Sequence, residues 1–126
     1  MSELQYQLDM YRLVCETSCD AFLFYSFEED EVRTLGKWNE FFSFEIKTIE
    51  DLPVLYDNMA DFYVEKVRNL VYLEKRKLPN GFCEALNRNK KNWYSINVTV
   101  EYDENDKPKN KLICIRDITK FKRQNE

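Results

Sequence analysis

The chain has 126 residues, of which 44% are hydrophobic and 15% aromatic, and its net charge is −4. This length allows one domain with a buried core and excludes two. Nucleic acid is excluded as the main partner, because the basic residues are scattered and phosphate binding needs a concentrated positive surface. The sequence has no apolar run of membrane-spanning length and no signal-peptide pattern, so we predict no membrane insertion and a cytoplasmic location.

The composition offers few of the residues that common catalytic sites need. Histidine is absent, and there are only two glycines. The usual general base, the nucleophile pairs that depend on histidine and the phosphate-binding glycine loops are therefore missing. The four cysteines, Cys15, Cys19, Cys83 and Cys114, contain no CxxC pair. We predict buried thiols, because a zinc site would need Cys83 and Cys114 to converge from distant strands.

An amphipathic helix is predicted over residues 3–17, where Leu4, Leu8 and Tyr11 recur at the spacing of one helical face. This stripe must be covered by the domain's own sheet or by a second copy of the chain. Leu4, Leu8 and Tyr11 are therefore the predicted dimer interface of a homodimer.

Two strands and a largely helical stretch are predicted next. Residues 20–27 are apolar on both alternating faces, which is typical of a strand inside a covered sheet, and residues 32–36 read as the returning strand of a hairpin. Thr48 and Asp51 have the spacing of a capping box. A long helix is then predicted to begin at position 57 or 58 and to run to the turn at 79–81.

The remainder is predicted to be β-structure, with strands at 82–86, 93–102 and 111–117, and with Pro108 outside any ladder. Residues 93–102 alternate between apolar and polar, whereas 111–117 are apolar on both faces and should lie centrally beside 20–27. The predicted fold class is α+β: a five-stranded antiparallel sheet with helices packed on one face and an amphipathic N-terminal helix.

The last strand ends in Asp117-Ile118-Thr119, and a charged helix start follows. Asp117 or Thr119 is predicted to cap a helix that begins near Lys120 by accepting backbone N–H groups. Ile118 and Phe121 are three residues apart and could anchor that helix to the sheet edge. We expect the helix to lead into a further domain.

The element order, with "WYSINVTVEYDENDKP" followed by "KLICIRDITKFK", resembles the PAS family of bacterial sensory domains. It is most similar to PAS modules placed ahead of diguanylate cyclase or histidine kinase domains. The resemblance implies an N-terminal helix at 1–17, a PAS-like core at 18–119 and the start of an output helix at 120–126. The chain departs from the family's pattern at Asn105-Asp106, where the family often has Asp-Gly.

In PAS domains the stimulus is typically sensed between the sheet and the helices. The resemblance makes six residues candidates for the lining of such a pocket, and each is also suited to a plain core: Phe24, Trp38, Phe42, Tyr63, Ile96 and Cys114. The implied signal relay is Asp117, Ile118 and Thr119. No cofactor is indicated, since the absence of histidine excludes histidine-ligated haem and the Asn-Cys-Arg sequence of light-sensing flavin domains is missing.

Three functions follow. The first is a non-catalytic PAS sensory domain that binds a small molecule or partner domain and relays a signal to a C-terminal effector, a cyclic-dinucleotide cyclase or a kinase. The second is a ligand-free dimerisation adaptor. The third is a small isomerase-like enzyme with Asp20 or Asp61 as a base. If the chain is a sensor, we expect an enclosed cavity with a polar group that points inward; if it is an adaptor, we expect no such cavity. If it is an enzyme, we expect a buried carboxylate that solvent can reach.

Overall fold

The computed structural model describes residues 20–72 and 80–124. Their elements are, in chain order, β1 (Ala21–Ser26), β2 (Glu31–Gly36), α2 (Trp38–Phe41), the 3-10 helix η1 (Ile49–Asp51), α3 (Pro53–Asp57), α4 (Asp61–Val71), β3 (Asn80–Leu86), β4 (Trp93–Tyr102), β5 (Pro108–Asp117) and α5 (Thr119–Gln124). The predicted N-terminal helix, with Leu4, Leu8 and Tyr11, lies outside the described residues.

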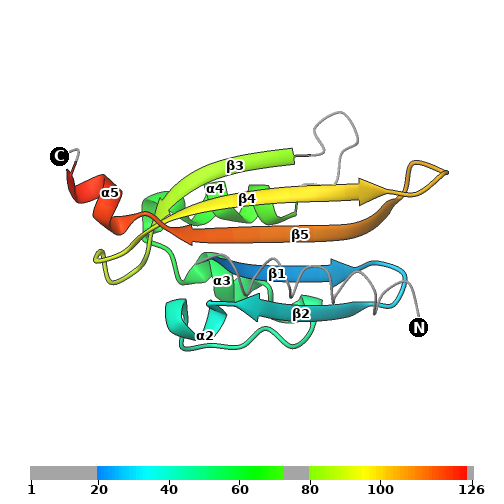
Figure 1. The fold of residues 1–126 in the computed structure, drawn as a ribbon, viewed down its shortest axis with the longest axis horizontal. Coiled ribbons are helices and arrows are strands. Elements are labelled where there is room, and N and C mark those ends of the chain that lie inside the picture. The colour runs from blue at the N-terminus through cyan, green and yellow to red at the C-terminus, as the bar shows by residue number, and fades with distance from the viewer. Residues whose placement is uncertain (1–19, 73–79, 125–126) are drawn as a thin grey trace.

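The five strands form one antiparallel sheet in the order β2-β1-β5-β4-β3 (Figure 1). This confirms the predicted fold class and the prediction that the two most apolar strands, β1 and β5, lie together at its centre. Their register pairs Ala21 with Ile115 and Ser26 with Asn110. The first and last strands of the domain therefore neighbour one another at the centre of an open sheet, whose two edges are β2 and β3.

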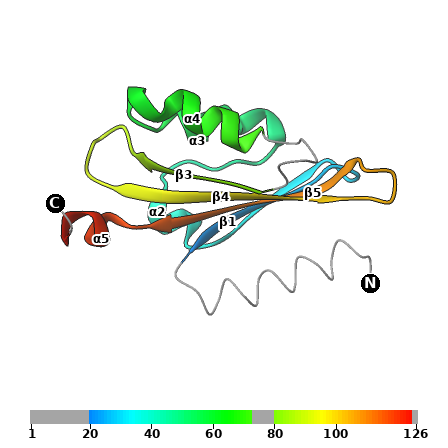
Figure 2. The same ribbon diagram turned by 90° about the horizontal axis from the view of Figure 1, so that it is seen from above.

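The helices α3 and α4 lie against one face of the sheet (Figure 2). Strand side chains alternate between the two faces, so one row from each strand meets the helices. This row and the facing residues form a single core cluster, which includes Leu23, Ile96, Val98, Ile113 and Ile115 from the sheet and Trp38, Phe42, Leu52, Leu55, Met59, Val67 and Val71 from the other side. Within the described ranges, no helix is both long enough and apolar enough to cross a membrane.

The start predicted for the long helix, position 57 or 58, was wrong, because residue 57 is the last of α3 and residues 58–60 separate it from α4. The chain between the two helices pairs with the turn after β3: the Ala60 N–H donates to the Leu86 carbonyl at 2.8 Å, and the Arg88 N–H donates to the Asn58 carbonyl at 2.7 Å. Because these backbone groups are bound to a distant segment, they cannot continue a helix. Helix α4 begins only at Asp61.

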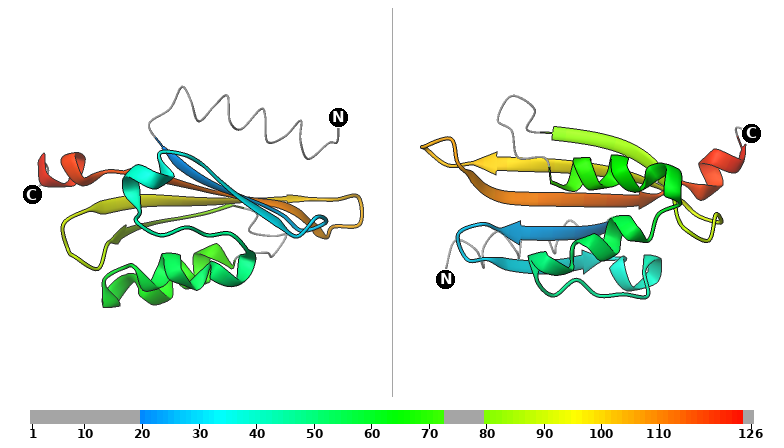
Figure 3. Two further views of the ribbon diagram at one scale, coloured as in Figure 1. Left: turned by 90° about the horizontal axis from the view of Figure 1, so that it is seen from below. Right: turned by 180° about the vertical axis from the view of Figure 1, so that it is seen from behind.

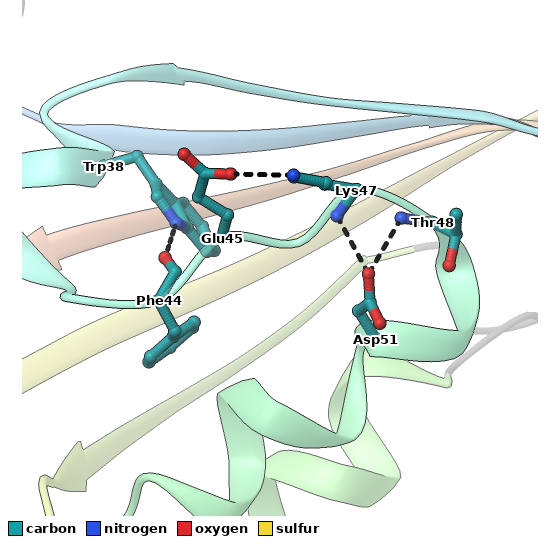
Figure 4. A network of polar contacts seen from close by, with 6 residues as sticks. All are labelled: Trp38, Phe44, Glu45, Lys47, Thr48 and Asp51. Carbon is teal, nitrogen blue, oxygen red and sulfur yellow. Dashed lines mark hydrogen bonds and ion pairs between the residues drawn. The ribbon is translucent and has the colours of Figure 1, made fainter.

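The capping box predicted at Thr48 and Asp51 is present at the start of η1. One carboxylate oxygen of Asp51 accepts the backbone N–H groups of Lys47 and Thr48 at 3.1 and 3.2 Å (Figure 4). In the same loop the Trp38 indole N–H donates to the carbonyl of Phe44 at 3.1 Å. These bonds fix the segment that carries the chain from the sheet edge to the helical face.

The hairpin between β4 and β5 turns without glycine. Asp106 takes the left-handed conformation, with φ 63°, and the carboxylate of Asp103 accepts the backbone N–H groups of Asn105 and Lys107 at 2.7 and 3.0 Å. Such Asx bonds stabilise a turn whose residues tolerate positive φ less well than glycine. The prediction that Pro108 lies outside any ladder was wrong: it is the first residue of β5, a position that needs no N–H donor, and pairs with Tyr102.

Candidate functional site

The six residues predicted to line a pocket do not gather at one place. Trp38, Phe42 and Ile96 belong to the core cluster on the helical face, and Tyr63 packs against its margin. The Trp38 and Phe42 rings lie 4.8 Å apart between centroids. These four residues therefore share one side of the sheet.

Phe24 and Cys114 face the other side of the sheet, so their predicted place in a pocket beneath the helices was wrong. Leu23, Ile113 and Ile115 belong to the helical-face cluster, and side chains on a strand alternate between faces. The sequence could not reveal this, because both strands are apolar on both faces and their periodicity does not say which row meets the helices.

Protein side chains fill the space where a PAS ligand was expected. Trp38, Leu52, Leu55, Met59 and Ile96 are all fully buried there. Large side chains that meet in this way form a packed interior, and filling it leaves little room for a small molecule unless neighbouring side chains move.

The predicted relay residues form a compact junction at the end of β5 where the chain turns into α5. The backbone N–H of Ile118 donates to the carbonyl of Trp93 at 2.9 Å, which extends the ladder between β4 and β5 by one bond. The carbonyl of Ile118 is turned into the new helix instead, where it accepts the N–H of Lys122 at 2.9 Å. The N–H of Trp93 therefore loses the acceptor that a continuing ladder would provide.

The hydroxyl of Thr119 replaces that acceptor. It accepts the Trp93 N–H at 2.9 Å and donates to the Asp117 carboxylate at 2.5 Å. The same Asp117 oxygen accepts the backbone N–H of Thr119 at 2.9 Å. Asp117 thus has the capping role predicted for it, whereas Thr119 is the first helical residue and its hydroxyl serves β4.

Helix α5 lies beyond the end of the sheet, where β5 finishes and β4 begins (Figures 1 and 3). Charged side chains hold it there: the Lys122 amine lies 2.6 Å from a carboxylate oxygen of Glu84 and 4.8 Å from the centre of the Trp93 ring. The guanidinium of Arg123 donates to the carbonyl of Lys91 at 3.2 Å. Phe121 was expected to anchor this helix with Ile118, but it is 61% exposed.

An open groove of about 690 Å³ borders this junction. We call it the edge groove; it lies between α4, the edge strand β3 and α5, and its lining includes Phe62, Lys66, Phe82, Glu84, Trp93 and Lys122. Sequence reasoning missed it, because Phe62 and Phe82 fall on predicted elements most of whose other apolar residues pack in or against the core. Their exposed fractions, 76% and 59%, are the signal that finds it.

The carboxylates considered for an enzyme have other surroundings. Asp20 is buried, but the Arg116 guanidinium binds both of its oxygens at 3.0 and 3.1 Å. Because both carboxylate oxygens are bound by this guanidinium, Asp20 lacks the apolar surroundings expected of the catalytic base. Asp61 is exposed.

Burial raises the pKa of the Cys114 thiol to about 11, and the adjacent Asp20 carboxylate adds to the effect. Cys83 belongs with the residues packed against the helical-face core, whereas Cys114 projects from the opposite face, so these two thiols do not converge. Among the described residues no cluster of three or more cysteine or acidic side chains is arranged to hold a metal ion.

No protein-family model matches the chain, and no curated protein matches its sequence. Solved structures do. The domain of a putative light and redox sensing histidine kinase from Haloarcula marismortui is 12% identical, with 88% of this chain and 99% of that chain covered and a TM-score of 0.60. A PAS domain from Colwellia psychrerythraea is 16% identical over 90% and 98%, with a TM-score of 0.58.

The N-terminal domain of a diguanylate cyclase with a PAS/PAC sensor from Marinobacter aquaeolei is also similar, at 13% identity over 81% of this chain and 97% of that chain, with a TM-score of 0.54. These neighbours are PAS domains of histidine kinases and diguanylate cyclases. The chain has the fold of a PAS domain.

Proposed function

We propose that the chain is a non-catalytic sensory or regulatory PAS domain of a bacterial signalling protein. It relays a change in its core or at its surface through Asp117, Ile118 and Thr119 to a C-terminal effector, a cyclic-dinucleotide cyclase or a kinase. The kinds of protein among its structural neighbours support this class of function. The hydrogen bonds at the junction of β5 and α5 support the proposed relay through Asp117, Ile118 and Thr119.

The observation that carries the proposal is that the Thr119 hydroxyl at the junction accepts a hydrogen bond from Trp93 and donates one to Asp117. Thr119 joins the first residue of β4 to the first turn of α5, and Asp117 holds the Thr119 hydroxyl in place. A shift of β4 relative to β5 would therefore change the bonds of the helix start. Loss of one cap changes the free energy by about 1 kcal/mol, enough to bias two states of similar energy without unfolding the domain.

A ligand-free adaptor that pairs two copies of the chain is the second candidate, and the filled interior supports it. Trp38, Leu55 and Met59 occupy the space where a small molecule was expected. In that case the domain would pair two chains and bind no ligand.

Mass spectrometry of the purified chain, under native and then denaturing conditions, separates the two. Mass that is lost on denaturation would identify a bound small molecule and favour the sensor of a dissolved ligand. An unliganded dimer would favour the adaptor. A monomer with no retained mass would contradict the adaptor. The first candidate would then remain, with a partner domain rather than a small molecule as its stimulus.

A further inference from the structure

The edge strand β3 offers unpaired backbone groups to the edge groove. In an antiparallel ladder, successive residues turn their N–H and C=O alternately toward the partner strand and away from it. The Leu86 carbonyl is directed away from β4, because it accepts the N–H of Ala60 at 2.8 Å. Phe82 and Glu84 have the same parity in the register with β4, so their backbone groups also point outward.

The outward backbone groups of Phe82 and Glu84 have no backbone partner among the described residues. Phe82 and Glu84 both line the edge groove, where α4 provides the facing wall through Phe62 and Lys66. A strand added beside β3 would therefore be bonded along one edge and covered by a helix flank. An enclosed pocket suits a small ligand, whereas an open groove with a free strand edge suits an extended peptide.

The two outer strands of the sheet differ in how they are protected. Exposed β-edges are usually blunted by charged side chains. Strand β2 carries the ion pair between Glu31 and Arg33, at 3.0 Å. Strand β3 has the sequence NGFCEAL, in which Glu84 is the one charged residue, and the Glu84 carboxylate is bound by Lys122.

The charge of the groove indicates what it would accept. Glu84 and Lys122 neutralise each other, while the Lys66 amine lies over the Phe62 ring, 5.7 Å from its centre, with no carboxylate within ion-pair distance among the described residues. The groove thus carries one excess positive charge in a chain whose net charge is −4. An anionic segment with apolar side chains complements both its amine and its exposed rings.

We propose that the edge groove binds an extended acidic peptide segment of a partner protein, which adds a strand to β3 by pairing with the backbone of Phe82 and Glu84. Its carboxylates lie near Lys66 on the helical side of the added strand, and its apolar side chains, which alternate with them, pack on Phe82 on the other side. This binding goes beyond the relay through α5 and does not depend on it, because it is a property of the chain by itself.

The test uses an N-acetylated octapeptide that alternates glutamate with valine or phenylalanine and carries a fluorophore, titrated with the full chain by fluorescence anisotropy. Saturable binding is expected. A peptide of the same side chains, N-methylated at alternate residues so that it cannot bond to the edge, should bind at least about tenfold more weakly, since it loses hydrogen bonds of about 1 kcal/mol each.

Lys66→Glu should weaken binding about fivefold, whereas Arg68→Glu, the same charge change on α4 outside the groove, should not. Circular dichroism and urea unfolding establish that both variants are folded. Equal binding of the N-methylated peptide, equal loss in both variants, or no saturable binding would overturn the proposal. So would a dimer that pairs through β3 and excludes the peptide, because it would assign this edge to a second copy of the chain.

Discussion

The hydroxyl of Thr119 accepts a hydrogen bond of 2.9 Å from the backbone N–H of Trp93, 26 positions earlier in the chain. This bond exists because the Ile118 carbonyl, the acceptor that an extended ladder would supply, is committed to the first turn of α5. A residue at position 119 must therefore bring its own acceptor. Serine or threonine can do so while also serving as a helical residue.

Thr119→Val tests this explanation directly. The substitution keeps the shape of the side chain but removes its oxygen, so the Trp93 N–H loses its acceptor. We expect the free energy of unfolding in urea to fall by about 1–2 kcal/mol, and amide exchange at Trp93 to accelerate. Thr99→Val, on the exposed face of the same strand, is the control and should change neither value. Equal stability of both variants would refute the role of the hydroxyl.

Lys111 ties β5 to the end of α4. Its side chain is 2% exposed, and its amine donates to the carbonyl of Val71 at 2.7 Å. The last carbonyls of a helix have no donor within the helix, so Lys111 supplies one for α4. Lys111→Met should lower the free energy of unfolding by about 1–3 kcal/mol, because a buried acceptor is left unsatisfied. Lys47→Met, at an exposed loop position, should be neutral in the same urea titration. An unchanged midpoint for Lys111→Met would show that the cap contributes nothing.

The Asp103 carboxylate predicts a pH dependence of the β4–β5 hairpin. The backbone N–H of Lys107, and then that of Asn105, hold its pKa below the ordinary value of 3.8. A pKa that is lowered by folding contributes stability that is present above the unfolded value and lost as pH falls through the folded one.

Asp103→Asn should therefore be less stable than the wild type near about pH 7, and this difference should shrink as the pH falls below about 4. Urea unfolding at several pH values measures it, and NMR titration of the Asp103 carboxylate checks the pKa itself. A difference that is constant across this range would contradict the assignment.

Cys114 should be a slow nucleophile. Its thiol has a pKa of about 11, chiefly because of burial and then because of Asp20, and the thiolate is the reactive form. Alkylation by iodoacetamide, followed residue by residue by mass spectrometry, should remain slow at neutral pH and accelerate toward pH 11. Asp20→Asn should accelerate it at a given pH. Reaction at the rate of an unfolded cysteine in the native wild type would contradict this environment.

Alternation and turn chemistry predicted much of the fold from the sequence. The strand 93–102 coincides with β4, because its apolar and polar residues alternate without interruption. The central position of β1 and β5 followed from strands that are apolar on both faces. The capping box at Thr48 was visible because its two partners are only three residues apart.

Long-range contacts explain the failures. A helix start was predicted at position 57 or 58, but the start of α4 at Asp61 is set by the bonds of Asn58 and Ala60 to residues 88 and 86, respectively. The same doubly apolar pattern that placed β1 at the centre concealed which of its rows faces the helices, so Phe24 was assigned to the wrong side. The Thr119 hydroxyl was predicted as a cap because its true donor, Trp93, is distant in sequence.

The most direct test of the proposed relay joins the chain through α5 to the catalytic domain of a diguanylate cyclase and measures the rate of cyclic dinucleotide synthesis. Asp117→Ala removes the acceptor that holds both the N–H and the hydroxyl of Thr119. Asp103→Ala is the matched control, because it removes a carboxylate that accepts two backbone N–H groups in the hairpin between β4 and β5, at the other end of the sheet.

We expect Asp117→Ala to change the rate of synthesis about fivefold, the factor that corresponds to a cap of about 1 kcal/mol, while circular dichroism shows a folded domain. Asp103→Ala should leave the rate at the wild-type value. Equal rates for the wild type and both variants, with the domain folded in each, would contradict a relay through Asp117, Ile118 and Thr119.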